Sequence, residues 1–158
     1  LTQKYSEYFR QMGSLSKAAS KIDETNVYQP GNPDTRRIMD ALVGENILPE
    51  SRLEGVENFE AFYDQVCAGK HGLILMEHYA NTDLPGLCYM LERSGNEKLV
   101  NLSKKIVAIA GMKLNEDNPV IRAFAESFTR VVIYPTRSLN KNEEKASSTE
   151  EAKAEEEA

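Results

Sequence analysis

The chain has 158 residues and a mass of 17.7 kDa, with 41% hydrophobic and 28% charged residues. This length suits one domain, and this composition excludes a collagenous, a disulfide-rich or a wholly disordered chain. Three of the 19 basic and seven of the 25 acidic residues lie in 141–158, so residues 1–140 carry 16 basic and 18 acidic side chains. A nearly neutral body argues against a general nucleic-acid-binding protein, because such proteins need a clustered positive field.

The two cysteines predict a reducing compartment. Cys67 and Cys88 lie in apolar stretches without CxxC spacing, so we expect both to be buried free thiols. The first ten residues lack the apolar core of a signal peptide, and no apolar run approaches the ~20 residues of a membrane span. The sequence therefore predicts no transmembrane segment.

The N-terminal part predicts helices. Leu1–Ile22 is polar with scattered aromatic residues, which indicates a helix interrupted near Gly13. After a linker containing Pro and Gly, Asn32 and Pro33 are typical of an N-cap and a first helical residue. Gly44 is expected to end this second helix. Its apolar face comprises Ile38, Met39, Leu42 and Val43.

The middle of the chain changes its hydrophobic period. Val56–Cys67 has helical spacing, with Gly69 placed as a C-terminal cap. Gly72–Met76 is a short, continuous apolar run, which is typical of a buried strand. Polar residues follow, and helical spacing then returns until Gly95, with the apolar positions Leu84, Leu87, Cys88 and Leu91.

Two more strands and a helix follow. Ile106–Ala110 and Val131–Tyr134 are predicted as buried strands, and between them Asn118 and Pro119 open a helix. One face of that helix carries Val120, Phe124 and Phe128. Apolar strands that alternate with helices predict an α/β fold, with a largely parallel sheet flanked by helices on both faces.

These patterns divide the chain into three parts. Residues 1–50 form an N-terminal helical segment that we expect to pack on the core, and residues 51–140 form the α/β core. The tail, 141–158, consists of Glu, Ala, Lys, Ser, Thr and Asn without a bulky apolar residue. It cannot bury a core, and is predicted to be disordered or a lone solvated helix.

The loop after the first predicted core strand carries the candidate chemistry. Ligands of α/β folds bind at the carboxyl ends of strands, and His78, one of two histidines, lies there with Asp83 five positions later. A carboxylate can hold one ring nitrogen while the other takes a proton from a substrate hydroxyl, so the pair predicts a general base. Two alternatives stay open. Asp83 caps its helix, and Glu77 either acts on His78 through its charge or points away.

The surrounding sequence has the order of a known family. Residues 59–83 read FEAFYDQVCAGKHGLILMEHYANTD, which gives a helix, a Gly-Lys turn, a buried strand and a His-x4-Asp signature. This order resembles the glycerolipid acyltransferase family, which includes 1-acyl-sn-glycerol-3-phosphate and glycerol-3-phosphate acyltransferases. Ile106–Met112 looks like the family's next strand, and Val132–Ser138 is similar to its second block, an apolar strand that ends in an arginine.

The sequence departs from the family pattern at two points. The residue before the family's histidine is usually Asn, whereas this chain has Glu77. A later family block of Glu-Gly-Thr-Arg character, which helps to bind phosphate, has no counterpart in these 158 residues. The resemblance covers residues 53–139.

The resemblance implies an acyltransferase of phospholipid biosynthesis with the core fold of glycerol-phosphate acyltransferases. A fatty acyl group would pass from acyl-CoA or acyl carrier protein to a hydroxyl of glycerol-3-phosphate or lysophosphatidic acid. His78 is then the general base, and Asp83 orients it. Arg137 is the candidate phosphate ligand, because its guanidinium is planar and permanently charged, and Lys113 is a second candidate for the phosphate or the acyl donor. The alternative for Arg137 and Lys113 is a solvated side chain.

The resemblance also implies the surroundings of the protein. We expect a cytoplasmic protein bound peripherally to the inner face of the membrane, with acyl carrier protein as a candidate partner. The acyl donor is a substrate, so no cofactor is expected, and the scattered carboxylates predict no metal site. The alternative from another class is a non-catalytic truncated or partner-binding fragment of this fold. A small esterase ranks last, because the chain lacks a Gly-x-Ser-x-Gly nucleophile turn.

Overall fold

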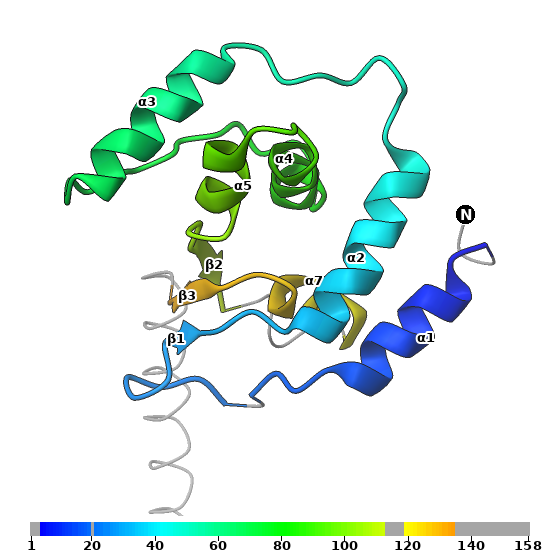
Figure 1. The fold of residues 1–158 in the computed structure, drawn as a ribbon. Helices are drawn as coiled ribbons and strands as arrows, with labels where there is room; N and C mark the ends of the chain where they lie inside the picture. The colour runs from blue at the N-terminus through cyan, green and yellow to red at the C-terminus, as the bar shows by residue number, and fades with distance from the viewer. Residues whose placement is uncertain (1–3, 20, 113–118, 135–158) are drawn as a thin grey trace, which may run out of the picture.

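The computed structural model describes residues 4–19, 21–112 and 119–134 (Figure 1). Its elements are α1 (Ser6–Leu15), β1 (Tyr28–Gln29), α2 (Pro33–Asn46), α3 (Val56–Cys67), α4 (Asp83–Glu92), α5 (Glu97–Ser103), β2 (Ala108–Gly111), α7 (Pro119–Glu126) and β3 (Arg130–Ile133). The predicted tail, 141–158, lies outside the described residues. The described part is therefore mainly helical, with a small mixed sheet.

The sheet has the strand order β1-β3-β2. β2 and β3 are parallel, with Ala108 opposite Arg130, and α7 lies between them in the sequence. β1 is antiparallel to β3, with Tyr28 opposite Val131, so the N-terminal segment contributes a strand to the sheet. The sequence patterns did not predict β1, because two residues are too few for any periodicity. The larger parallel sheet stays a prediction.

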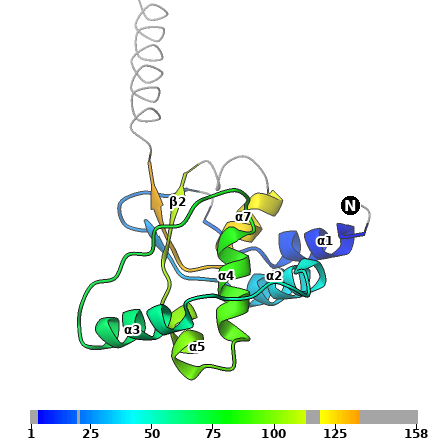
Figure 2. The ribbon, with the colours of Figure 1, turned by 90° about the horizontal axis from the view of Figure 1, so that it is seen from above.

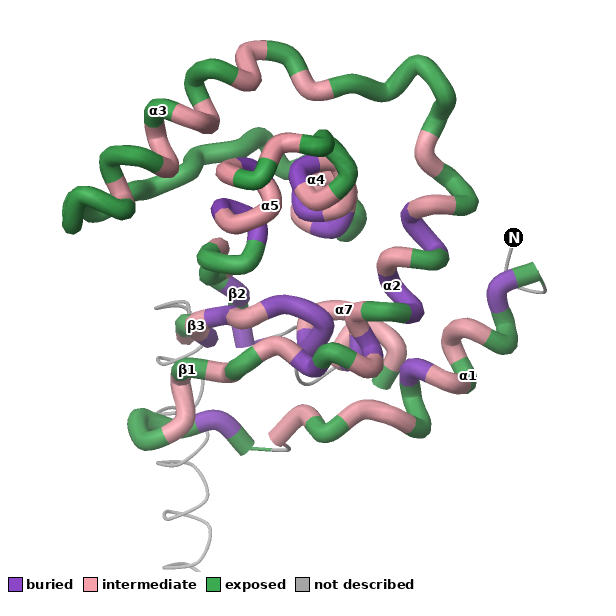
Figure 3. Tube along the Cα trace, viewed as in Figure 1, coloured by how far each residue is buried: buried purple, intermediate pink, exposed green. Residues whose placement is uncertain are grey.

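The predicted strand at Gly72–Met76 is wrong for the described structure. This segment is irregular and exposed (Figure 3). The helix before it is held on α5, where Lys98 Nζ pairs with Asp64 Oδ2 at 2.6 Å and Asn96 Nδ2 donates to Glu60 Oε1 at 2.6 Å. The chain thus leaves α3 without meeting a partner strand. An apolar run encodes burial, but it does not encode which strand will pair with it.

Two further expectations need correction, and one helix was not predicted. α1 passes through Gly13 without a break, because the packing of its buried Met12 outweighs the helix cost of about 1 kcal/mol for one glycine. α5 is an additional helix, capped by Asn96, whose side chain accepts the Lys98 amide at 3.0 Å. Cys88 is buried as expected, but Cys67 is exposed, because α3 buries no residue completely.

The predicted start and apolar face of α2 are confirmed, but its predicted end is not. Asn32 accepts the Asp34 amide at 3.0 Å and Pro33 is the first helical residue, while the four predicted apolar positions are all buried. α2 continues two residues past Gly44, which lies against the Tyr89 ring: a Cβ there would be 2.7 Å from the Tyr89 hydroxyl oxygen. Gly44 therefore permits close packing of α2 on α4 instead of ending the helix.

The main core lies where α1, α2, α4 and α7 meet, and α1 and α2 run side by side in both ribbon views (Figures 1 and 2). Its buried members are Tyr5, Met12, Ile38, Met39, Leu42, Val43, Cys88, Ala123 and Phe128. A smaller cluster of Ile22, Met112 and Val132 lies at the sheet. Apolar residues of the N-terminal segment belong to both clusters.

A buried carboxylate fastens the N-terminal segment to α7. Glu126 accepts hydrogen bonds from the Ser16 hydroxyl at 2.6 Å, from the Lys17 amide at 2.7 Å and from Asn32 Nδ2 at 2.7 Å. These donors lie between α1 and α2, while Glu126 is the last residue of α7. One side chain therefore connects three elements.

We expect Glu126→Ala to lower the free energy of unfolding by on the order of 1–3 kcal/mol, because it leaves buried donors without an acceptor. Urea unfolding measures the change. The matched control is Glu24→Ala at an exposed position, for which we expect a change within about 0.5 kcal/mol. Equal losses in the two variants would contradict the role of Glu126.

Candidate active site

The predicted histidine and aspartate meet at the start of α4. Asp83 Oδ2 lies 3.0 Å from His78 Nδ1, and the same oxygen accepts the amides of Tyr79 at 2.7 Å and Ala80 at 2.8 Å. Thr82 is the N-cap of α4, and its side chain makes no capping hydrogen bond. The carboxylate of Asp83 therefore points back into the loop that precedes the helix, so Asp83 does not act as a helix cap.

These contacts keep Asp83 ionised and orient the ring of His78. The hydrogen bond from the Ala80 amide, with those from His78 and Tyr79, holds the pKa of Asp83 below its ordinary value. Asp83 is therefore ionised at neutral pH and can only accept, so Nδ1 of His78 carries the proton in this contact. In the neutral ring, Nε2 then has a free lone pair. The His78 side chain is 74% exposed, so a substrate hydroxyl can reach it.

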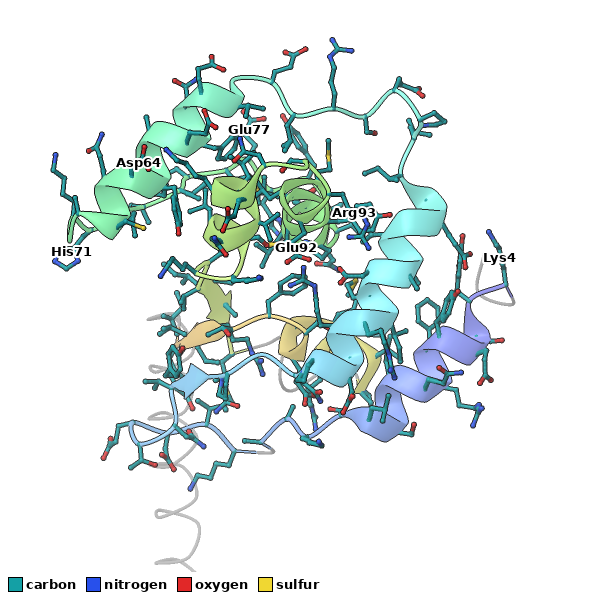
Figure 4. All side chains as sticks on the ribbon, in the orientation of Figure 1. Lys4, Asp64, His71, Glu77, Glu92 and Arg93 are labelled. Carbon is teal, nitrogen blue, oxygen red and sulfur yellow. The ribbon has the colours of Figure 1, made fainter. Side chains whose placement is uncertain are left out.

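The Glu77 carboxylate contacts Tyr79 and not His78. Its carboxylate accepts a hydrogen bond from the Tyr79 hydroxyl, which raises the pKa of Tyr79. The structure thus directs Glu77 to Tyr79. The second histidine, His71, lies at the end of α3, apart from Glu77 (Figure 4).

A groove of about 710 Å³ opens beside His78. Its walls come from α3, the segment 72–76, α4, α5, β2, α7 and β3 with the residues between them, and include Leu75, Leu84, Ile109, Ile121, Phe124 and Phe128. Its size is that of a small-molecule site, and its walls are mainly apolar. Among the described residues that line it, Lys105, Arg130 and His78 can carry positive charge and none is acidic. The groove therefore suits an anionic molecule with a long apolar part.

Arg130, like Lys105, is a charged lining residue that sequence reasoning missed. It is 1% exposed at the start of β3, and its Nη1 donates to the Ala125 carbonyl at 3.3 Å. Burial lowers the pKa of Arg130, although Glu126 nearby acts in the opposite direction. The available signal was an arginine at the start of an apolar strand, but sequence alone does not show that this strand lines a groove.

The other predicted residues cannot be placed. Arg137 and Lys113 lie outside the described residues. Within residues 4–19, 21–112 and 119–134, no group of three or more His, Cys, Asp or Glu side chains could hold a metal ion. No helix in these same ranges is long and apolar enough to cross a membrane.

Comparisons of the chain with family models, with curated proteins and with solved structures found no significant match.

Proposed function

We propose that this chain is an O-acyltransferase of phospholipid biosynthesis. It moves a fatty acyl group from acyl-CoA or acyl carrier protein to a hydroxyl of glycerol-3-phosphate or lysophosphatidic acid, and it works in the cytoplasm, bound peripherally to the inner face of the membrane. The observation that carries the proposal is the 3.0 Å contact between His78 Nδ1 and Asp83 Oδ2 beside an apolar groove. The His-x4-Asp resemblance supplies the substrate class.

The chemistry follows from the orientation of the ring. Nε2 of His78 takes the proton of the acceptor hydroxyl while the hydroxyl oxygen forms a bond to the thioester carbonyl carbon. The C–S bond then breaks, and the proton on Nε2 passes to the leaving thiolate. Asp83 holds Nδ1–H throughout, so it fixes the tautomer and stabilises the charged ring.

The groove supports this substrate class. Leu84, Ile121 and Phe124 line the part formed by α4 and α7, and they offer apolar contacts to an acyl chain. Lys105 complements an anionic head group, and no described acidic residue lines the groove to repel one. We assign the substrate phosphate to Arg137 by the resemblance alone, and Lys113 is a second candidate for the phosphate or the acyl donor.

The direct test is an acyl-transfer assay on the purified protein, with acyl-CoA or acyl carrier protein as donor and each of the two acceptors. We expect an acylated product that depends on the acceptor and releases one free thiol per ester formed. Binding of an acyl donor without any transfer under these conditions would contradict the proposal and favour a non-catalytic binding protein.

Arg137→Ala tests the phosphate assignment. We expect this change to raise KM for the acceptor, because a charged hydrogen bond to phosphate is lost. If the contact is buried, the loss of binding free energy is on the order of 2–3 kcal/mol. Steady-state kinetics with varied acceptor measure it. The control is Arg52→Ala, which removes a largely exposed arginine paired with Glu54. An unchanged KM in Arg137→Ala would remove this residue from the site.

A further inference from the structure

A second groove, of about 590 Å³, lies between α2 and α4, and we call it the α2–α4 groove. Small residues leave the room for it, because Ala41 and Gly44 follow Arg37 by four and seven positions and so share one side of α2 with it. The Tyr89 ring packs against Gly44 and forms the wall on the α4 side. The α2–α4 groove shares no described lining residue with the groove beside His78.

The carboxylates that line the α2–α4 groove are already paired. Asp40 Oδ1 accepts a hydrogen bond from Arg36 Nε at 2.9 Å, and Arg36 Nη2 also donates to Glu92 Oε1 of α4 at 2.8 Å. Glu45 Oε2 lies 3.5 Å from Lys4 Nζ. Each lining carboxylate therefore has a cation of the chain as its partner, and neither is left to neutralise a further arginine.

Two other arginines line the same groove and have no such partner. Among the side chains that the structure describes, no carboxylate forms an ion pair with Arg37 or Arg93. Arg37 is exposed on α2, whereas Arg93 is the C-cap residue of α4. The Arg93 guanidinium lies 3.7 Å from the centre of the Tyr89 ring. This contact holds Arg93 beside α2 (Figure 4) and so restrains a long side chain before any ligand binds.

A phosphate monoester fits these two arginines. A guanidinium is planar and permanently charged, and it binds phosphate through two parallel N–H···O hydrogen bonds. A monoester presents three terminal oxygens, which is enough for two guanidinium groups. The volume of the α2–α4 groove is that of a small-molecule site, so the organic part of the ester also finds room in it.

We infer that the α2–α4 groove binds the phosphate of a phosphate monoester through Arg37 and Arg93, at a site separate from the active site. Asp83 is the first residue of α4 and Arg93 follows its last, so ten residues, about 15 Å of helix, separate them. The inference does not depend on acyl transfer at His78. The phosphate belongs either to a soluble ester or to a lipid head group, since both present the same oxygens.

Titration calorimetry with phenyl phosphate tests the site. An Arg137→Ala background removes the phosphate ligand that we assign to the active site. In that background, Arg37→Gln and Arg93→Gln should each raise the Kd at least ~10-fold, because each removes a charged hydrogen bond. The control is Arg52→Gln, which removes an exposed arginine paired with Glu54 and should leave the Kd unchanged. An unchanged Kd in both groove variants would overturn the site.

A charge placed in the groove gives a second test without removing an arginine. Ala41 is exposed on α2 and lines the groove, so Ala41→Glu should leave the helix intact and raise the Kd for phenyl phosphate at least ~10-fold. The matched control is Ala61→Glu, at an exposed position of α3. Circular dichroism checks that both variants fold. Equal Kd values in the two variants would contradict the site.

Vesicles separate the two sources of the phosphate. Sedimentation compares phosphatidylcholine vesicles that contain phosphatidic acid with vesicles that contain phosphatidylserine at the same surface charge. A preference for phosphatidic acid that Arg37→Gln and Arg93→Gln remove supports the site and assigns it to a lipid head group. Binding of phenyl phosphate without that preference supports the site and assigns it to a soluble ester. Binding of neither probe would overturn it.

Discussion

Replacing His78 with alanine should lower acyl transfer by ~10²–10⁴-fold, the usual contribution of a positioned general base. The acceptor hydroxyl then loses the imidazole that takes its proton, while Oδ2 of Asp83 stays bonded to the loop amides of Tyr79 and Ala80. Binding of the acyl donor should be unchanged. Product formation under saturating donor and acceptor measures the first effect, and equilibrium binding measures the second.

The chain offers a matched control in its only other histidine. His71 is exposed at the end of α3, so His71→Ala should keep the transfer rate within about twofold, as expected for a surface change. Full transfer by His78→Ala would refute the mechanism. A similar loss in both variants would show that the activity depends on the fold of this region and not on one imidazole.

Asp83→Asn should lower transfer by roughly 10²-fold or more, although the side chain keeps its size. An amide can donate to Nδ1, which favours the tautomer that carries its proton on Nε2 and so cannot accept one from the substrate. The kcat for transfer should fall, while KM for the acceptor should change little.

The control for this change is Asp64→Asn, which alters an exposed carboxylate of α3 that is paired with Lys98 of α5. Its kinetics should match those of the wild type. If Asp83→Asn also transferred at the wild-type rate, Asp83 would serve only to shape the loop through the Tyr79 and Ala80 amides.

The sequence predicts those structural features that are determined by residues a few positions apart. Asn32 and Pro33 start α2 by themselves, and the apolar spacing of Val56–Cys67 gives the bounds of α3. The contact of His78 with Asp83 belongs to this class, because a single turn joins them. Local hydrogen bonds and periodicity are written in consecutive positions, so one sequence suffices to identify them.

The features that the sequence could not predict depend on contacts between residues far apart in the chain. β1 exists because Tyr28 lies opposite Val131, and no feature of the linker announces that pairing. Gly44 reads as a helix end, yet its lack of a Cβ serves the approach of Tyr89. Arg130 reads as a strand residue, and its place at the groove follows only from the sheet order. The Gly72–Met76 run reads as a strand, yet it pairs with no strand of the described sheet.

The contacts of Glu126 with residues far earlier in the chain affect the order in which the protein folds. Ser16 and Glu126 are 110 positions apart, and β1 waits for β3, which lies still further along the chain. During synthesis the first thirty or so residues therefore leave the ribosome long before their partners exist, and they must pay a large loop-closure entropy to join them later. The pairing of β1 with β3 and the contacts of Glu126 should therefore be among the last to form.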